Sequence, residues 1–288
     1  MNPASTTTAP AAMTRGGVRL PVPVVVADLD GTIVHSLRRF PDPAGMVVVE
    51  RYENRDVGIV TAACWSALQE LQSAAELIPV TARVRRQYER VLFPATPRIA
   101  VIEAGARILV EGTPDAAWDE RSTQIVAATG VGPSDVVARM SLLDLAEPGR
   151  IGDVALAYVR VASDAGLVEF ERWCVGRGWS VVGQDGRIYA LPDGIGKAEG
   201  AARAVELADG VIVAAAGDGL MDEAMLRLAP FALTPELGPL WESGFRFATP
   251  VSGFGPLTSE RIVLEALIAV QRHRKLPFDT KAFARDDD

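Results

Sequence analysis

Cysteine and histidine are scarce in this chain. Its 288 residues include two cysteines, Cys64 and Cys174, and two histidines, His35 and His273. Both cysteines are isolated in apolar stretches, which favours buried, reduced thiols in a cytoplasmic protein over a disulfide framework. So few histidines do not indicate a His-rich metal site.

Long apolar runs and an excess of basic charge are missing too. The longest apolar runs, such as residues 211–216, fall far short of the roughly 18 residues that cross a bilayer. The first twenty residues lack the apolar segment of a secretory signal and are predicted to be a flexible tail. A net charge of −8 and a pI near 5.0 argue against a nucleic-acid partner and against an anionic membrane surface, because both require a basic protein.

The composition that remains, 49% hydrophobic and 23% charged, is that of a globular protein with one large core or two smaller ones. Its organising stretch is residues 24–33, VVVADLDGTI. A β-branched run that ends in two acids and a glycine predicts a buried strand with Asp28 and Asp30 at its carboxyl end. Residues two apart on a strand face the same side, so both carboxylates can meet one cation or one reacting group. For this stretch alone, a solvated Asp-Gly turn is the alternative.

Strands and helices alternate from this stretch to about residue 112. A hairpin is expected at residues 46–52 and 57–60, followed by a helix that Thr61 caps. Further strands are predicted at residues 77–81, 98–102 and 108–110. This pattern is typical of an α/β fold with a doubly wound parallel sheet.

The alternation breaks between residues 113 and 187, where an inserted α+β cap domain is predicted over the carboxyl edge of the sheet. An ordinary second half of the core is the alternative. The core pattern is expected to resume with a strand at residues 188–191, with later strands at 211–216, 231–234 and 245–248 and a final helix at 259–270. The predicted organisation is a tail (1–20), a core in two parts (21–112 and 188–275), the cap (113–187) and a second tail (276–288).

Four short segments at strand ends or helix starts carry the candidate catalytic residues. Asp28 and Asp30 suit phosphoryl transfer, in which one carboxylate attacks phosphorus and its neighbour donates and then accepts a proton. Mg²⁺ prefers oxygen ligands, so Asp28, Asp218 and Asp222 are candidate metal ligands. Thr81 and Lys197 are candidates to bind the phosphoryl oxygens. Taken singly, a Thr that ends a strand is usually a cap and a Lys after Gly is usually solvated.

A nucleotide-binding loop is not expected from the glycines. The Gly-x-x-x-x-Gly-Lys-Ser/Thr motif fails around Lys197, because Leu191 stands five residues before Gly196 and Ala198 follows the lysine. The Gly217-Asp218-Gly219 segment lacks the third glycine of a dinucleotide fingerprint, because Asp222 stands there.

Together the segments resemble the four motifs of the haloacid dehalogenase (HAD) superfamily of phosphohydrolases. Those motifs run Asp-x-Asp-Gly-Thr, then Ser or Thr, then Lys, then Gly-Asp-x-x-x-Asp. The chain has them in order as Asp28-Leu-Asp30-Gly-Thr, Thr81, Lys197 and Gly217-Asp218-Gly-Leu-Met-Asp222. The place of the insert is similar to that of members with a C2-type cap, in the branch of sucrose-phosphate phosphatases, and segments such as 78–83 also look like a subgroup encoded beside tellurium-resistance genes.

The resemblance implies an Mg²⁺ site in which Asp30 contributes its backbone carbonyl, and a substrate-binding set of Thr81, Ala82, Arg83 and Lys197. Two departures stand out. Family members often carry Ser and Asn where this chain has Gly219 and Met221, which removes polar groups from around the metal. Ala104-Gly105 replaces a frequent Asn-Gly.

The expected function is an Mg²⁺-dependent phosphohydrolase that forms an aspartyl-phosphate on Asp28. The acidic composition and the resemblance favour a small phosphorylated metabolite, such as a sugar phosphate, over a phosphoprotein or nucleic acid. A phosphomutase and a catalytically weak phospho-ligand-binding protein are the alternatives.

Overall fold

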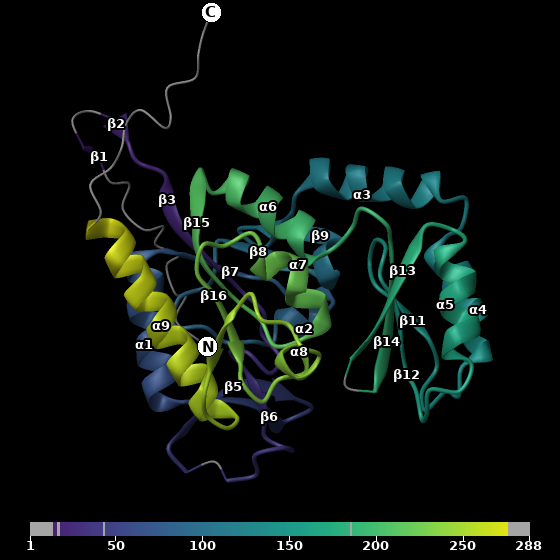
Figure 1. The fold of residues 1–288 in the computed structure, drawn as a ribbon, viewed down its shortest axis with the longest axis horizontal. Helices are drawn as coiled ribbons and strands as arrows, with labels where there is room; N and C mark the ends of the chain where they lie inside the picture. The colour runs from purple at the N-terminus through teal and green to yellow at the C-terminus, as the bar shows by residue number, and fades with distance from the viewer. Residues whose placement is uncertain (1–13, 16–17, 43, 185, 276–288) are drawn as a thin grey trace, which may run out of the picture.

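The computed structural model describes residues 14–15, 18–42, 44–184 and 186–275. Its central element is a five-stranded parallel sheet (Figure 1). Its order is β17-β16-β15-β3-β7, and an isolated parallel bridge between Val80 and Val101 places β8 beyond β7. The strands are β3 (Val22–Ala27), β7 (Glu76–Pro79), β8 (Ile99–Ile102), β15 (Gly210–Ala216), β16 (Ala232–Pro235) and β17 (Thr249–Val251). The predicted doubly wound α/β fold is confirmed.

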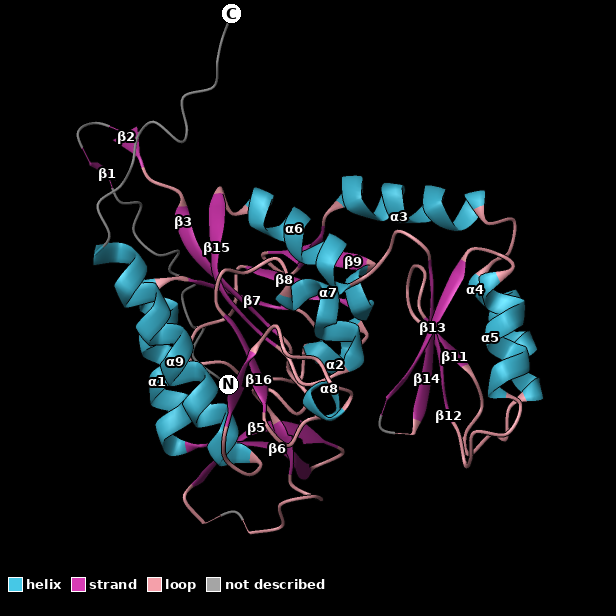
Figure 2. Ribbon diagram, in the orientation of Figure 1, coloured by secondary structure: helices cyan, strands magenta, loops and turns pink. Residues whose placement is uncertain are grey.

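Strand β3 lies between β15 and β7 and is buried on both faces, as its continuous apolar sequence predicts. Val25 and Ala27 pack on one side with α1 (Ala62–Ala74) and α9 (Pro256–Lys275), whereas Val24 and Val26 pack on the other side with α6 (Lys197–Leu207) and α7 (Glu223–Leu226) (Figure 2). The sheet is therefore a buried layer whose carboxyl edge is held in a fixed position.

A hairpin that follows the first strand in the chain belongs to a separate three-stranded sheet. Strands β5 (Met46–Tyr52) and β6 (Arg55–Thr61) form it, with the short β4 (His35–Ser36) beside β6. Thr61 caps α1, because its hydroxyl accepts a hydrogen bond of 2.9 Å from the backbone N–H of Cys64. Both features agree with the sequence prediction.

The cap is a separate four-stranded antiparallel sheet in the order β11-β12-β14-β13, covered on one face by α4 and α5 (Figure 2). Its strands are β11 (Arg150–Ile151), β12 (Ala157–Arg160), β13 (Trp179–Gln184) and β14 (Arg187–Pro192), and its helices are α4 (Pro133–Arg139) and α5 (Leu167–Val175). The inserted α+β module thus forms its own sheet and does not continue the central one.

One strand differs from the prediction. The sequence pattern places residues 188–191 in the resumed core, but β14 pairs with β12 and β13 in the cap sheet. Its alternating apolar pattern fits either sheet, and only the pairing distinguishes them. At the other end, α3 (Ala116–Ala128) packs on the core through the buried Trp118. We therefore propose that the cap extends to Pro192.

The remaining elements are short. They are β1 (Thr14–Arg15), β2 (Val18–Arg19), α2 (Arg85–Tyr88), η1 (Glu103–Gly105), β9 (Arg107–Val110), β10 (Thr113–Pro114), η2 (Met140–Leu142), η3 (Leu220–Asp222) and α8 (Pro239–Glu242).

The prediction of a strand at residues 245–248 is wrong, since β17 begins at Thr249. Cys64 and Cys174 are buried free thiols, as predicted. In the predicted tails, β1 and β2 pair with each other, whereas residues 1–13, 16–17 and 276–288 lie outside the described residues.

Within the described ranges, no helix has the length and apolar character of a membrane span.

Candidate active site

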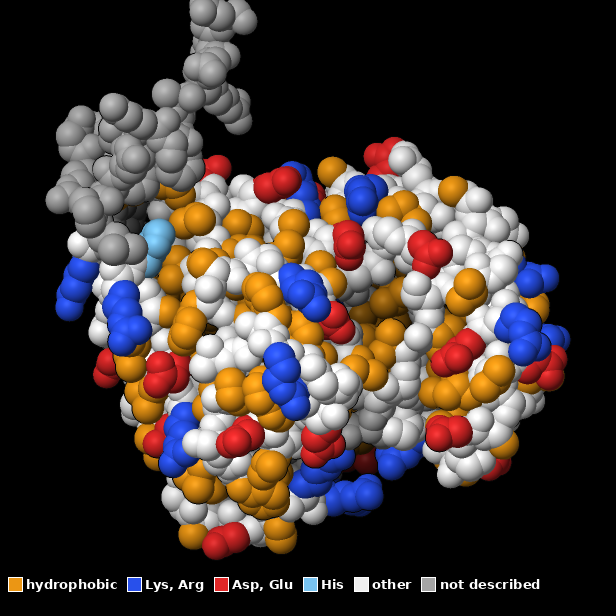
Figure 3. All heavy atoms as spheres, in the orientation of Figure 1, with side chains coloured by type: hydrophobic (Ala, Val, Ile, Leu, Met, Phe, Trp, Pro, Cys, Tyr) orange, Lys and Arg blue, Asp and Glu red, His pale blue; other side chains and the backbone are white. Residues whose placement is uncertain are grey.

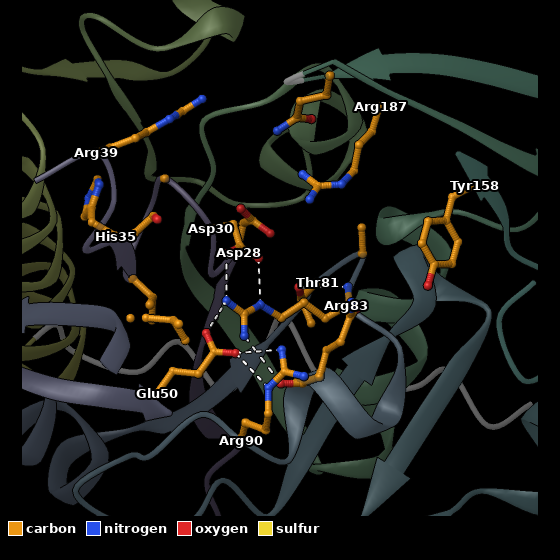
Figure 4. Close-up of a pocket in the computed structure, with 18 of the residues that line it drawn as sticks. Asp28, Asp30, His35, Arg39, Glu50, Thr81, Arg83, Arg90, Tyr158 and Arg187 are labelled. Atoms are coloured by element: carbon orange, nitrogen blue, oxygen red, sulfur yellow. Dashed lines mark hydrogen bonds and ion pairs between the residues drawn. The ribbon is translucent and has the colours of Figure 1, made fainter. Parts of the chain in front are cut away.

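The predicted residues meet at the carboxyl edge of the central sheet. Asp28 and Asp30 follow β3, Thr81 follows β7, Asp218 follows β15, and Lys197 begins α6. All but the fourth-motif acids line one cavity of about 480 Å³ between the core and the cap (Figures 3 and 4). Carboxylate oxygens of Asp218 and Asp222 lie within 4.8 Å of Asp28, which lines it. Open α/β sheets bind ligands at this edge.

Lys197 is the centre of the buried part of the site. Its ammonium Nζ lies 2.6 Å from Asp28 Oδ1 and 2.7 Å from Asp222 Oδ1. The lysine and both aspartate side chains are at most 5% exposed. Despite the cost of burial, the two carboxylates raise the pKa of Lys197 above its usual value, so the ammonium stays charged.

The fourth-motif loop wraps around Asp222. The second carboxylate oxygen of Asp222, Oδ2, accepts hydrogen bonds from the backbone N–H groups of Asp218 (3.1 Å) and Gly219 (2.9 Å). Thr32 of the first motif donates a hydrogen bond of 3.4 Å to Asp218 Oδ1. Gly31 has φ +84°, and a Cβ there would collide with the Asp218 carboxylate. The two loops therefore require a glycine at their closest approach.

Three buried carboxylates, of Asp28, Asp218 and Asp222, bring oxygen atoms within 4.8 Å of one another. Burial raises the pKa of Asp28 to about 7; Asp222 and Asp30 act in the same direction, and Lys197 opposes them. An oxygen-only donor set of three clustered carboxylates fits a hard divalent cation such as Mg²⁺, so the residues present suit the metal that the motifs predict.

Asp30 is held differently from Asp28. Its side chain is 60% exposed and accepts two hydrogen bonds from Arg83, 2.7 Å from Nε and 2.8 Å from Nη2 (Figure 4). Desolvation acts to raise the pKa of Asp30, but the hydrogen bonds and charge of Arg83 outweigh it and hold that pKa below its usual value. Arg83 also pairs with the buried Glu50 at 2.9 Å.

Thr81 is buried beside this pair, with 1% of its surface exposed. Its hydroxyl accepts a hydrogen bond of 3.2 Å from the backbone N–H of Arg83, and both Thr81 and Ala82 line the cavity. The structure brings the predicted residues together, although Arg83, predicted to bind substrate, here contacts Asp30 and Glu50.

The sequence prediction missed the cap side of the cavity and Glu50. Five polar cap residues line the cavity: Tyr158, Arg160, Gln184, Arg187 and Tyr189. They come from three strands that only the pairing brings into register. Glu50 stands in a hairpin strand among valines, and its burial beside Arg83 and Arg90 leaves no mark in the sequence.

The two departures in the fourth motif both lie against the cap. A Cβ on Gly219 would overlap the side-chain amide of Gln184, so only glycine lets this cap residue approach the loop. Met221 packs against an apolar cluster that Tyr158 and Tyr189 also join. The polar groups that the family often has here are replaced by contacts to the cap.

No family model and no curated protein matches the chain. Solved structures do match in fold. Sucrose-phosphatase from Synechocystis sp. PCC6803, solved with sucrose and phosphate, aligns with a TM-score of 0.63 at 11% identity over 88% of this chain and 99% of that one. A HAD-superfamily phosphatase from Bacteroides thetaiotaomicron aligns with a TM-score of 0.53 at 14% identity, over 86% of this chain and 96% of that one. A trehalose-6-phosphate phosphatase related protein gives 0.51 at 16%, over 86% and 99%.

These likenesses establish the fold. The chain has the Rossmann-like core and inserted cap that HAD phosphatases share, over nearly the full length of each matched structure.

Proposed function

We propose that the protein is an Mg²⁺-dependent phosphohydrolase of the HAD type that acts on a small phosphorylated metabolite. The observation that carries the proposal is the meeting of Asp28, Lys197, Asp218 and Asp222 at the carboxyl edge of the sheet, under a cap. The fold shared with sugar phosphatases supports the choice of substrate size.

Asp28 is the nucleophile in this proposal. Lys197 engages Oδ1, so Oδ2 is the candidate attacking atom. Its attack on phosphorus forms an aspartyl-phosphate and breaks the ester P–O bond. The ammonium of Lys197 and the hydroxyl of Thr81 then neutralise or bind the phosphoryl oxygens as charge develops on them.

Asp30 is the proposed acid and base. It gives a proton to the departing alcohol, and it then takes one from the water that hydrolyses the aspartyl-phosphate. Arg83 favours its ionised form, so Asp30 must leave the two Arg83 hydrogen bonds before it can carry a proton. Substrate entry is the event that would compete for Arg83.

The carboxylates of Asp28 and Asp218, oriented with Asp222, would hold Mg²⁺. When bound, the cation supplies charge neutralisation for the phosphoryl oxygens beside the nucleophile. Asp222 has both oxygens engaged, by Lys197 and by two backbone N–H groups, so its part is to orient the loop that carries Asp218.

Phosphate release from p-nitrophenyl phosphate, with and without Mg²⁺, tests the proposal. We expect turnover with Mg²⁺ and its loss after chelation with EDTA. A panel of phosphorylated metabolites then identifies the substrate class, because the cavity residues outside the catalytic edge, the cap face among them, distinguish leaving groups. Binding of phosphate esters without turnover of any compound in the panel would favour a phospho-ligand-binding protein instead.

A further inference from the structure

The cap sheet presents two different faces. Along β12 and β14, Ala157, Val159, Ile188 and Ala190 pack against the cap helices. The alternate residues Tyr158, Arg160, Arg187 and Tyr189 line the cavity above the catalytic edge. The second face of the cap sheet would therefore contact a molecule bound in the cavity.

Two arginines on this face lie directly opposite each other. Arg160 on β12 is the register partner of Arg187 on β14, and Gln184 on β13 is the partner of Arg187 on its other side. Like charges directly opposite on neighbouring strands are destabilising. Within the described part of the chain, neither guanidinium forms a salt bridge with an acidic side chain. An anion bound between the two guanidinium groups would relieve their repulsion.

Gln184 gives a second indication that the cap face binds a molecule. Its side-chain Oε1 is buried and has no hydrogen-bond partner among the described residues. An unpaired buried amide oxygen costs free energy, and a hydroxyl of a bound molecule would satisfy it.

The cavity as a whole is cationic although the chain carries a net charge of −8. Seven cationic side chains line it, against the three acids Asp28, Asp30 and Glu50. Arg83 and Arg90 are paired with these acids, and Lys197 serves the nucleophile. On the cap, the charge of Arg187 acts on Asp30 from a distance, and Arg160 has no part in the proposed chemistry of one phosphoryl group.

We propose that Arg160 and Arg187 form a second anion site on the cap, which binds a carboxylate or a further phosphate of the substrate, apart from the phosphoryl group that is transferred. Gln184 beside them accepts a hydrogen bond from a hydroxyl of the same molecule. Arginine suits this task because its planar fork binds carboxylate and phosphate with two parallel hydrogen bonds. The inference rests on the proposed phosphohydrolase function and deepens it: the substrate is a phosphate ester with a second anionic group.

Matched substrates test the site. The kcat/KM for 3-phosphoglycerate is compared with that for glycerol 3-phosphate, which has a hydroxymethyl group in place of the carboxylate. Glucose 1,6-bisphosphate is compared with glucose 6-phosphate for the phosphate alternative. We expect one of the two doubly anionic compounds to be preferred about 10- to 100-fold, as a charge-assisted hydrogen-bonded pair supplies.

Variants then locate the preference. Arg160→Gln and Arg187→Gln should each lower the preference ratio about tenfold, and Arg160→Lys should restore part of it. Arg172→Gln, an exposed arginine on α5 on the far side of the cap, is the matched control and should leave the ratio unchanged. An equal fall in kcat/KM for both members of a pair would mean that the arginines serve the transferred phosphoryl group, and would overturn the proposal.

Different results would contradict the phosphohydrolase function and the second anion site. Absence of Mg²⁺-dependent turnover of p-nitrophenyl phosphate contradicts the phosphohydrolase. Turnover of that ester without preference for either doubly anionic compound contradicts the second anion site alone. Calorimetric titration of the Asp28→Asn variant with 3-phosphoglycerate, glycerol 3-phosphate and the glucose phosphates gives a reading without turnover. Equal affinities within both pairs would likewise overturn the second site.

Discussion

The core edge and the cap face line the same cavity, but their charged side chains differ in burial and in pairing. At the core edge, Lys197, Asp28 and Asp222 are almost fully buried and paired within 2.7 Å. On the cap face, Arg187 is exposed and lies opposite Arg160, another cation. Buried pairs are held in one geometry, whereas these two arginines form no ion pair with an acidic side chain among the described residues and can bind an anion. Under the proposed function, the core would carry a reaction common to phosphate esters and the cap would select among them.

The largest effect is expected from Asp28→Asn at the core edge. The amide is nearly isosteric but a poor nucleophile, so turnover should fall by at least about 10³-fold while the fold is kept. Steady-state phosphate release and circular dichroism measure the two quantities. Asp164→Asn, in an exposed cap loop, is the matched control and should retain full activity. Substantial activity in the Asp28 variant would remove that residue from the role of nucleophile.

The core edge could be predicted from the sequence because its residues follow apolar strands. Parallel strands end at one edge, so the strand pattern alone is enough to bring Asp28, Thr81 and Asp218 together. The cap face could not be predicted in this way, since Arg160, Arg187 and Gln184 meet only through antiparallel register. A shift of one residue in that register would turn each side chain to the other face.

The same reasoning explains the error at β14. Its residues alternate, as in any half-buried strand, and they precede the Lys197 helix, as a core strand would. The pairing partners that place it in the cap lie about 30 residues earlier in β12 and a few residues earlier in β13. Local pattern predicts a strand but does not name its neighbours.

The second prediction concerns the stability of the core edge. Lys197→Met leaves Asp28 and Asp222 buried without their cation, which should lower the free energy of unfolding by about 3–5 kcal/mol at pH 7. Urea denaturation measures the loss. Mg²⁺ should recover part of it, because a bound cation stabilises the folded state. Lys275→Met, at the exposed end of α9, is the control. Unchanged stability would mean that the buried pairs do not set this geometry.

The third prediction is that the protein loses folding stability in acid because of His35 in the core. His35, 8% exposed, lies 2.6 Å from the hydroxyl of Ser259, which donates to the Thr32 carbonyl at 2.6 Å. Ser259 gives its one proton to the Thr32 carbonyl, so His35 donates to Ser259 through Nε2–H. Burial lowers the pKa of His35 to about 4.

The direction of the pH dependence of stability follows from proton uptake at His35. Between pH 6.5 and 4 the unfolded chain binds a proton at this histidine and the folded chain does not, so stability is lost as the pH falls through that window, by on the order of 2–3 kcal/mol. Denaturation curves at pH 7, 5.5 and 4.5 measure it. His35→Gln should flatten the dependence, with His273→Gln, near the end of α9, as the control. The same slope in the His35 variant would assign the acid sensitivity to other groups.

The smallest predicted effect lies where the two regions touch. Gly219→Ser restores a residue that HAD phosphatases often have, but its Cβ would overlap the amide at the flexible end of Gln184, so that side chain must move away. Overpacking costs about 1–3 kcal/mol, and a side chain that can rotate keeps the loss at the lower end of that range. Shortening the cap residue by Gln184→Ala should recover most of that loss in the double variant, because the two changes share one contact. A double-mutant cycle from urea denaturation measures the coupling. If the losses in unfolding free energy of the two single variants simply add, the cap does not contact the loop through Gln184. Another contact would then have to hold the cap in place over the core.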